Sequence, residues 1–370
     1  MKDNQAKYPQ LRFKGFTDPW EERKLADVVS ISAGGDVDKT KLIEDGGYPV
    51  LANALTNSGI VGYYDSYKVE APAVTVTGRG DVGHAVARHV NFTPVVRLLS
   101  LKSEVLDADF LANMLNQTNI LVESTGVPQL TAPQLGSYKI LYPNLNEQTK
   151  IGKLLNAFDN LIALHQRKLA KFKELKQGYL QKMFPQNGSK FPQLRFAGFA
   201  DAWEQRKLGD ITKISTGKLD ANAMVENGKY DFYTSGIKKY RIDVAAFEGP
   251  SITIAGNGAT VGYMHLADNK FNAYQRTYVL QEFLVDRSFM FSEIGNKLPK
   301  KIKQEARTGN IPYIVMDMLT ELKLSIPQNN SEQQKIGSFF KQLDDTIDLH
   351  QRKLEKLQEL KKGYLQKMFC

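Results

Sequence analysis

The chain has 370 residues, of which 42% are hydrophobic and 24% charged, and its formal net charge is +9. This length allows two or three domains with separate cores. No apolar run reaches the roughly 20 residues of a membrane helix, and the first residues lack the apolar part of a signal peptide. The single cysteine excludes a disulfide framework and a thiolate metal site. We therefore expect a cytoplasmic protein.

The first domain is expected to be β-rich. Short strands are predicted at 61–64, 73–77 and 95–101, and one helix at 106–118. Residues 75–85, TVTGRGDVGHA, contain G-x-G-x-x-G after a strand, which is the spacing of a dinucleotide-binding fingerprint. Such a site needs a helix directly after the last glycine, but the residues that follow are β-branched and interrupted by Pro94. The glycines therefore predict a tight turn between strands.

A long helix is predicted after the first domain, and a second one at the end of the chain. Their apolar residues recur at alternating spacings of four and three, which is typical of a coiled-coil seam. The seam consists of Ile151, Leu155, Phe158, Ile162, His165 and Leu169 in the first helix and of Ile336, Phe340, Leu343, Ile347, His350 and Leu354 in the second.

The second domain is predicted to have the same plan as the first. Strands are expected at 251–256, 277–283 and 322–327 and a helix at 286–298. Its glycine motif at 253–263, TIAGNGATVGY, has one additional residue before the last glycine. A phosphate cradle would not tolerate that change of spacing, whereas a hairpin loop would.

An internal duplication explains this order. Residues 8–28 return at 191–211 with 14 of 21 positions identical, and residues 165–184 return at 350–369 with 16 of 20 identical. The segments between them differ in sequence. We therefore divide the chain into a first domain, a first spacer helix, a linker with the second domain and a second spacer helix, at 1–146, 147–184, 185–331 and 332–370.

The positive charge is distributed unevenly. The two helical segments carry net charges of +5 and +2, whereas residues 20–146 carry −4. This favours local basic patches over a uniformly basic DNA-coating surface.

No catalytic constellation is found. The chain lacks the Asn/Asp-Pro-Pro-aromatic motif of amino-methyltransferases and a Walker loop, and its five histidines make no metal set. The nuclease-like E-x-K at 321–323 recurs at 174–176 inside the coiled coil, which favours chance.

Both copies contain, in the same order, PQLRF-x-GF with W-E-x-R-K-L, a β-rich domain with its glycine loop, P-x-x-x-E-Q and a helix ending GYLQKMF. This order resembles the specificity subunit of type I restriction-modification systems, HsdS, over essentially the whole chain. The resemblance implies an α+β protein with two tandem mixed α/β target recognition domains, joined by two long helices that form an antiparallel coiled coil with pseudo-twofold symmetry.

The resemblance also implies a function and partners. The chain would be a non-catalytic subunit whose two domains read the halves of a split double-stranded DNA target. It would dock two methyltransferase subunits, which carry S-adenosylmethionine and methylate adenine N6, and through them restriction subunits that use ATP and Mg. No cofactor is expected in this chain.

Candidate DNA contacts are polar loop side chains that suit base edges and basic side chains that suit phosphates. They are Lys68, Thr77, Arg79, His84 and Arg88 in the first domain and Lys238, Lys239, Arg241, Asn257, Gln275, Arg276, Lys300, Lys301, Lys303 and Arg307 in the second. Candidate partner contacts on the helices are Gln166, Lys168, Lys171, Gln351, Lys353 and Lys356. For each lone arginine or lysine, a solvated surface charge is the competing explanation.

Three alternatives remain open. The chain could be a scaffold of two β-rich modules that bind a protein or glycan, a self-sufficient enzyme, or an inactive or recombined specificity gene. The DNA target and the number of unread base pairs do not follow from the residues.

Overall fold

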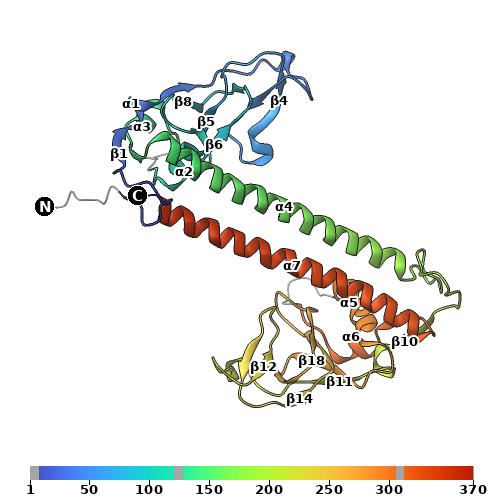
Figure 1. The fold of residues 1–370 in the computed structure, drawn as a ribbon. Helices are drawn as coiled ribbons and strands as arrows, with labels where there is room; N and C mark the ends of the chain where they lie inside the picture. The colour runs from blue at the N-terminus through green and yellow to red at the C-terminus, as the bar shows by residue number, and fades with distance from the viewer. Residues whose placement is uncertain (1–7, 121–127, 306–311, 370) are drawn as a thin grey trace. The chain divides into compact units, whose positions relative to one another are not determined.

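The structure is a computed structural model that describes residues 8–120, 128–305 and 312–369. It divides into two compact units. Unit 1 comprises residues 1–166 and 352–370, and unit 2 comprises residues 167–351 (Figure 1). Each long helix therefore contributes one part to each unit.

Unit 1 contains a four-stranded antiparallel sheet in the order β2-β8-β5-β6, a three-stranded sheet in the order β4-β3-β7 and the pair β1-β9. Helix α2 packs on β5 and β6. The strands are β1 (Glu21–Lys24), β2 (Ser30–Ala33), β3 (Tyr48–Leu51), β4 (Ile60–Tyr64), β5 (Ala73–Thr77), β6 (Ala85–Arg88), β7 (Thr93–Pro94), β8 (Leu98–Lys102) and β9 (Lys139–Tyr142), and the helices of the domain are α1 (Leu25–Val28), α2 (Ala108–Gln117) and α3 (Ala132–Gly136).

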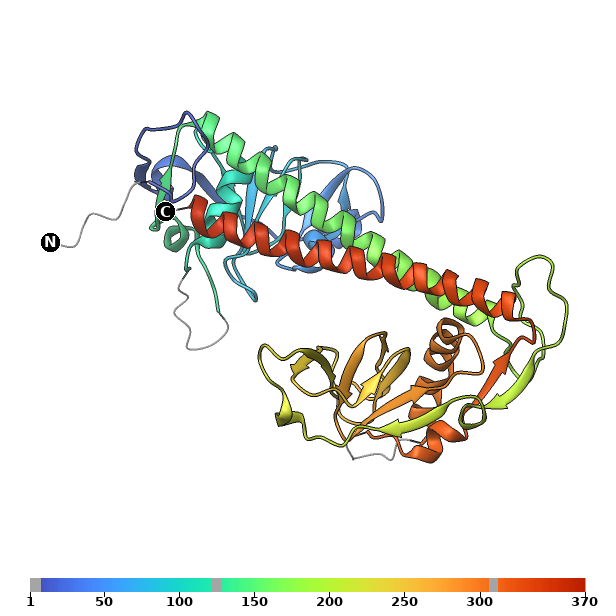
Figure 2. The same cartoon turned by 60° about the horizontal axis from the view of Figure 1, so that its bottom comes forward.

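Unit 2 repeats this plan. Its sheet β11-β18-β15-β16 has the same order as the four-stranded sheet of unit 1, beside a second sheet β13-β12-β17-β14 and the pair β10-β19. Figure 2 shows its strands in yellow and orange with the orange helix α5 beside them. The strands are β10 (Glu204–Lys207), β11 (Lys213–Thr216), β12 (Tyr230–Tyr233), β13 (Tyr240–Ile242), β14 (Phe247–Glu248), β15 (Ser251–Ala255), β16 (Met264–Ala267), β17 (Lys270–Ala273), β18 (Thr277–Gln281) and β19 (Lys323–Ile326), and the helices are α5 (Arg287–Glu305) and α6 (Met316–Thr320).

The predicted strands and helices are observed, with two differences in extent. The strand expected at 95–101 begins only at Leu98, as β8. The helix expected at 286–298 continues to Glu305, past Pro299. Proline lacks the N–H that a helix interior needs, yet the helix does not end at Pro299. The helix continues because Leu298 is fully buried and Ile302, one turn later, packs against the same core.

The long helices α4 (Leu145–Met183) and α7 (Asn330–Met368) pack antiparallel in each unit. In unit 1 the rings of Phe158 and Tyr364 lie 5.3 Å apart, and Lys361 Nζ lies 2.5 Å from Asp159 Oδ1. Unit 2 has the corresponding ion pair Lys176–Asp344 and a stacked pair of rings, Phe172 and His350, 5.5 Å apart. The predicted seam residues are all buried or half-buried.

The repeated sequence ends form the same ion pair in both units. In unit 1 the Arg12 guanidinium donates to the Glu147 carboxylate twice, at 2.6 and 2.7 Å. In unit 2 Arg195 donates to Glu332 at 2.7 and 2.8 Å. Both carboxylates are 0% exposed, and the arginine side chains are 12% and 13% exposed. The arginine of PQLRF therefore binds the glutamate of the E-Q motif, which lies in the first turn of each long helix.

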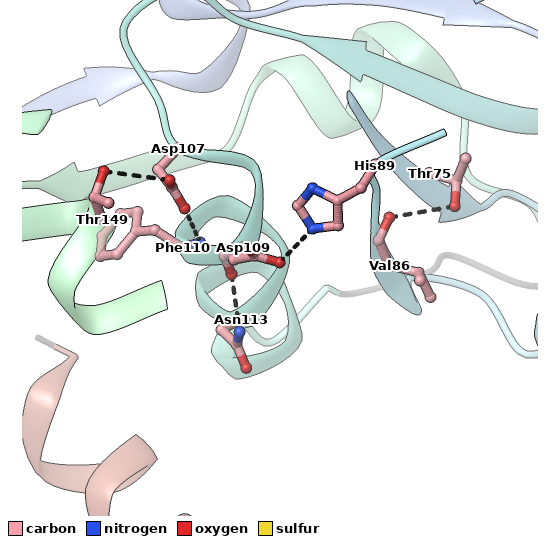
Figure 3. Close-up of polar contacts among 8 residues, drawn as sticks. All are labelled: Thr75, Val86, His89, Asp107, Asp109, Phe110, Asn113 and Thr149. Atoms are coloured by element: carbon pink, nitrogen blue, oxygen red, sulfur yellow. Dashed lines mark hydrogen bonds and ion pairs between the residues drawn. The ribbon is translucent and has the colours of Figure 1, made fainter. Parts of the chain in front are cut away.

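Next to this ion pair, polar side chains connect helix α2 to the long helix α4. Gln148 accepts a hydrogen bond from the Asp107 backbone N–H at 2.9 Å, and the Asp107 carboxylate caps α2 by accepting from the Phe110 N–H at 3.0 Å. Figure 3 shows Asp107 between Phe110 and Thr149 of α4. A Cβ on Gly152 would lie 2.8 Å from Asp107 Oδ1, so glycine permits the close approach. The equivalent residues of unit 2 are Gln333, Asp286, Phe289 and Gly337.

The GYLQKMF ends complete the two cores. In unit 1 Phe369 lies against the rings of Trp20 and Phe110, with centroids 6.4 and 5.4 Å away. The corresponding rings of unit 2 are Phe184, Trp203 and Phe289. The repeated ends thus have a structural function that is the same in both units.

Candidate nucleic-acid interface

A glycine loop joins two strands of the four-stranded sheet in each unit. Residues 78–84 connect β5 to β6, and residues 256–263 connect β15 to β16. Gly80 and Gly258, which are equivalent, adopt φ values of +79° and +85°, a left-handed conformation that favours glycine. The prediction of a tight turn between strands is confirmed, because an antiparallel strand follows each loop.

The first glycine of each loop packs against an arginine. A Cβ on Gly78 would lie 2.3 Å from the Arg97 carbonyl oxygen, and one on Gly256 would lie 2.2 Å from that of Arg276. Both arginines directly precede a central strand, β8 or β18. The absence of a side chain therefore lets the segment before this strand lie against the glycine loop.

A second loop, which follows β3 or β12, holds the glycine loop in place. In unit 1 Asn53 Oδ1 accepts from the Gly78 N–H at 2.8 Å. In unit 2 the Ser235 hydroxyl donates to Asn257 Oδ1 at 2.6 Å, and the Thr260 hydroxyl donates to the Ser235 carbonyl. The second loop therefore contacts the glycine loop in both units, but through different side chains.

A further segment borders the same loops. The Leu130 N–H donates to the Gly78 carbonyl at 2.9 Å, and the Ile314 N–H donates to the Gly256 carbonyl at 2.7 Å. The residues at the loop tips, Arg79 and Asn257, form backbone bridges to the residues before these two. Four segments of each unit form one surface, which we call the loop site. They are the glycine loop, the second loop, the arginine segment with Arg97 or Arg276, and the border segment with Leu130 or Ile314.

The predicted contacts of unit 1 fall into two groups. Arg79, His84 and Lys68 are exposed. Thr77 is buried, and its hydroxyl is occupied by the Asp81 carbonyl and the His84 N–H. Arg88 donates to Thr75 Oγ1 at 2.9 Å and to the Ser58 carbonyl at 3.0 Å, and burial lowers its pKa. Thr77 and Arg88 therefore shape the loop site from within, and Arg79 and His84 can face a ligand.

The predicted contacts of unit 2 divide similarly. Arg241 donates to the carbonyl groups of Gly228 and Lys229 at 3.0 and 2.7 Å and pairs with Asp231, so its guanidinium serves the fold. The remaining candidates are exposed or partly exposed: Lys238, Lys239, Asn257, Gln275 and Arg276.

The basic patch lies on the second half of α5. Lys300 and Lys303 are exposed, and Lys301 pairs with Glu305 one turn later. Arg307, which was predicted to belong to this patch, lies outside the described residues.

Sequence reasoning missed an aromatic cluster in unit 2. The ring of His265 lies 4.9 Å from that of Tyr263 and 5.1 Å from that of Tyr233. Burial raises the pKa of Tyr233 to about 12 and lowers the pKa of His265, which favours the neutral imidazole. Tyr263 is 40% exposed beside the glycine loop and can stack on or pack against a ligand. Alignment of the two copies would have found it, because Tyr263 replaces His84.

Arg97 and the two residues that hold the loops, Asn53 and Ser235, were missed as well. The helix candidates for partner binding lie at the surface: Gln166, Lys168, Lys171, Lys353 and Lys356 are exposed, and Gln351 is partly exposed.

No group of three His, Cys, Asp or Glu residues among the described residues could hold a metal ion. No helix in the described part of the chain is long and apolar enough to cross a membrane.

The two units thus share one fold and differ in the side chains of their loop sites. Residues 17–174 and 200–359 match the model of the type I restriction modification DNA specificity domain. The matched stretches make up more than half of the chain, which therefore belongs to this family. The membership confirms the predicted resemblance and the assignment to non-catalytic DNA specificity subunits.

Curated relatives agree. The chain is 34% identical over 164 residues to the EcoDI specificity subunit of Escherichia coli, covering 44% of this chain and 36% of that subunit. It is 23% identical over 305 residues to the MjaVIII specificity subunit of Methanocaldococcus jannaschii, covering 71% and 70% of the two chains. The chain thus spans about a third of the first relative and more than two thirds of the second.

A solved structure confirms the fold. The crystal structure of a type I restriction-modification S subunit from M. genitalium superposes with a TM-score of 0.79 at 19% identity, over 98% of this chain and 99% of that one. The predicted class, two mixed α/β modules with two long packed helices, is confirmed.

Proposed function

We propose that the two units read different halves of a split, asymmetric DNA target through their loop sites and leave the base pairs between the halves unread. The observation that carries this proposal is that the two loop sites share one backbone arrangement but differ at the tip of the glycine loop. Arg79 in unit 1 is replaced there by Asn257 in unit 2. An arginine suits guanine O6 and N7, whereas an asparagine amide suits adenine or a single base acceptor. Two such tips suit two different half-sites.

The hydrogen bond from Ser235 refines the proposal for unit 2. Because the hydroxyl holds Asn257 Oδ1, the amide nitrogen is the group that can face a base. It can donate to a purine N7 or to thymine O4. The exposed ring of Tyr263 can contact a thymine methyl group or a sugar beside it.

The exposed positions of the repeated helices suit two copies of one partner. We assign them to two adenine-N6 methyltransferase subunits, which would carry S-adenosylmethionine and connect to restriction subunits that use ATP and Mg. The net charge of −4 over residues 20–146 supports this dependence on partners, because non-specific DNA affinity comes largely from neutralising phosphates.

The test is to map N6-methyladenine across the genome of matched strains with and without the gene, in the presence of an active methyltransferase subunit. We expect methylation of one split motif to disappear when the gene is deleted. An unchanged methylome would refute the function and favour a scaffold that binds a protein or glycan.

Single substitutions assign the halves. Arg79→Ala should relax the motif only in the half assigned to unit 1, and Asn257→Ala only in the other half, with about 1–3 kcal/mol of discrimination lost at one base pair. Relaxation of both halves by either variant would contradict separate recognition.

A further inference from the structure

Arg97 and Arg276 are the same residue type at the same position of two loop sites whose tips differ. Each precedes a central strand and presents its carbonyl oxygen to the first glycine of the loop. The Gly256 N–H also donates to the Arg276 carbonyl at 2.8 Å. The frame therefore fixes the backbone of both arginines next to the side chains proposed to read bases.

Arg97 has two features that the folding of unit 1 does not require. Its φ is +69°, in the left-handed region that non-glycine residues rarely adopt. Its Nη1 is buried and has no hydrogen-bond partner in the described part of the chain. A buried donor without an acceptor is unfavourable, and more so when the group is charged. Strained backbone and unsatisfied charge of this kind concentrate at binding sites.

Two other arginines, one in each unit, behave differently. Arg88 donates to Thr75 and to the Ser58 carbonyl, and Arg241 donates to two carbonyl groups and pairs with a carboxylate. An arginine that supports the fold here thus finds intramolecular acceptors. Arg276 is exposed at the surface of its loop site.

We infer that Arg97 and Arg276 are the shared phosphate contacts of the two units, each donating to a backbone oxygen of the DNA beside its half-site. This inference rests on the proposed function. A base contact by a residue common to both units would select the same base in both half-sites, whereas the phosphate is common to every sequence. The planar guanidinium also matches two phosphate oxygens.

Such a contact adds affinity beside each tip without selecting a base. The first loop glycine contacts the carbonyl oxygen of Arg97 or Arg276 and directly precedes Arg79 or Asn257 in the sequence. A phosphate held by the arginine therefore lies next to the base pair that the loop tip contacts. Arg97 and Arg276 act on the DNA backbone, and Arg79 and Asn257 act on base edges.

The experiment measures DNA affinity of the complex of this chain with its methyltransferase subunits, against salt, for duplexes with the mapped motif and with one altered half-site. Arg97→Gln and Arg276→Gln should each reduce the slope of log K against log salt by about 0.9, the value for one phosphate contact. The ratio of affinities for correct and altered motifs should stay unchanged. Arg97→Lys should largely restore the slope, because a point charge also neutralises a phosphate.

Arg79→Gln is the matched control, because it should lower the ratio of affinities at one base pair of the unit 1 half-site. Arg97→Gln and Arg97→Lys keep a side chain at the left-handed position, and thermal unfolding verifies that both variants fold. An unchanged slope, or a changed base preference in Arg97→Gln, would overturn the inference while the proposed function stands. Absence of motif-specific binding by the unaltered complex would overturn the proposed function, and the inference with it.

Discussion

The ion pair between Arg195 and Glu332 allows a quantitative test of what the repeated ends do. The Glu332 carboxylate is 0% exposed and Arg195 is 13% exposed, and two hydrogen bonds at 2.7 and 2.8 Å join them. Glu332→Gln keeps the size of the side chain but removes its charge. It also turns an amide N–H₂ toward the guanidinium.

Breaking a buried pair by removing one partner typically costs about 3–5 kcal/mol. Glu332→Gln should lie near 3 kcal/mol, because Arg195 has some contact with water. Arg195→Met should cost more, because it leaves a fully buried carboxylate without a cation. Replacement of both residues by methionine should cost less than the sum of the two single variants, since no uncompensated charge is left.

The two tryptophans of the chain provide separate reporters. Trp20 lies buried in unit 1 and Trp203 in unit 2. In a Trp20→Phe background, urea unfolding followed by fluorescence therefore reports on unit 2. With a slope of about 1–3 kcal/mol per molar urea, a loss of about 3 kcal/mol in Glu332→Gln should lower the midpoint by about 1–3 M.

Unit 1 contains the matched control. In a Trp203→Phe background, the unit 1 transition should respond to Glu147→Gln and much less to Glu332→Gln. A midpoint of unit 2 that does not move would refute the argument that the E-Q motif stabilises the domain joint, and so would an equal shift of both transitions.

Two further variants test the loop site and a buried acid. Gly256→Ala would bring a Cβ to 2.2 Å from the Arg276 carbonyl oxygen. It should destabilise unit 2 by about 1–3 kcal/mol, measured by urea unfolding. The control is Gly178→Ala in a helix, where a Cβ would meet nothing within 4 Å and should stabilise the protein by about 0.5–1 kcal/mol. Burial raises the pKa of Glu293 from 4.5 to about 7. The protonated carboxyl group therefore stabilises unit 2 fully below about pH 4.5, and this contribution is lost as the pH rises to about 7. The total loss is about 3 kcal/mol. Glu293→Gln should remove this slope between pH 5 and 7.5, and a slope that persists would contradict the assignment; Met114 stands at the equivalent position of unit 1, which should lack it.

Much of the fold could be predicted from the sequence because its signals are local or duplicated. The heptad spacing of α4 and α7 and the alternation of β5 and β15 depend only on neighbouring residues. The duplication then indicated that both units would share one plan. α5 is the exception, because tertiary packing of Leu298 and Ile302 outweighed the local signal of Pro299.

The turn between the strands could be predicted, but the roles of the arginines around it could not. The glycines indicated the turn, and Arg79 and Asn257, which lie between glycines, are exposed and partly exposed. The sequence could not tell Arg88, which binds Thr75, from Arg97, whose Nη1 has no partner in the described residues. That difference depends on contacts between segments far apart in the chain. The partnership of Arg12 with Glu147 escaped detection for the same reason.

The two loop sites share a backbone arrangement and differ in the residue at the loop tip. The last prediction therefore concerns the exchange of these residues, Arg79→Asn in unit 1 and Asn257→Arg in unit 2. Arg79 is exposed, and Asn53 already binds the loop backbone beside it, so Arg79→Asn should change the stability of unit 1 by less than about 0.5 kcal/mol. Asn257→Arg breaks the hydrogen bond from Ser235 and should cost unit 2 about 1 kcal/mol.

The two exchanges should nevertheless alter methylation alike, each in one half of the motif only. Arg79→Asn removes the guanidinium that suits guanine, and Asn257→Arg introduces one. Methylome mapping of both variants, together with the unfolding of each unit, measures specificity and stability separately. If Arg79→Asn left its half of the motif unchanged, the tip would not touch a base, and base recognition would belong to the second loop or to the border segment instead.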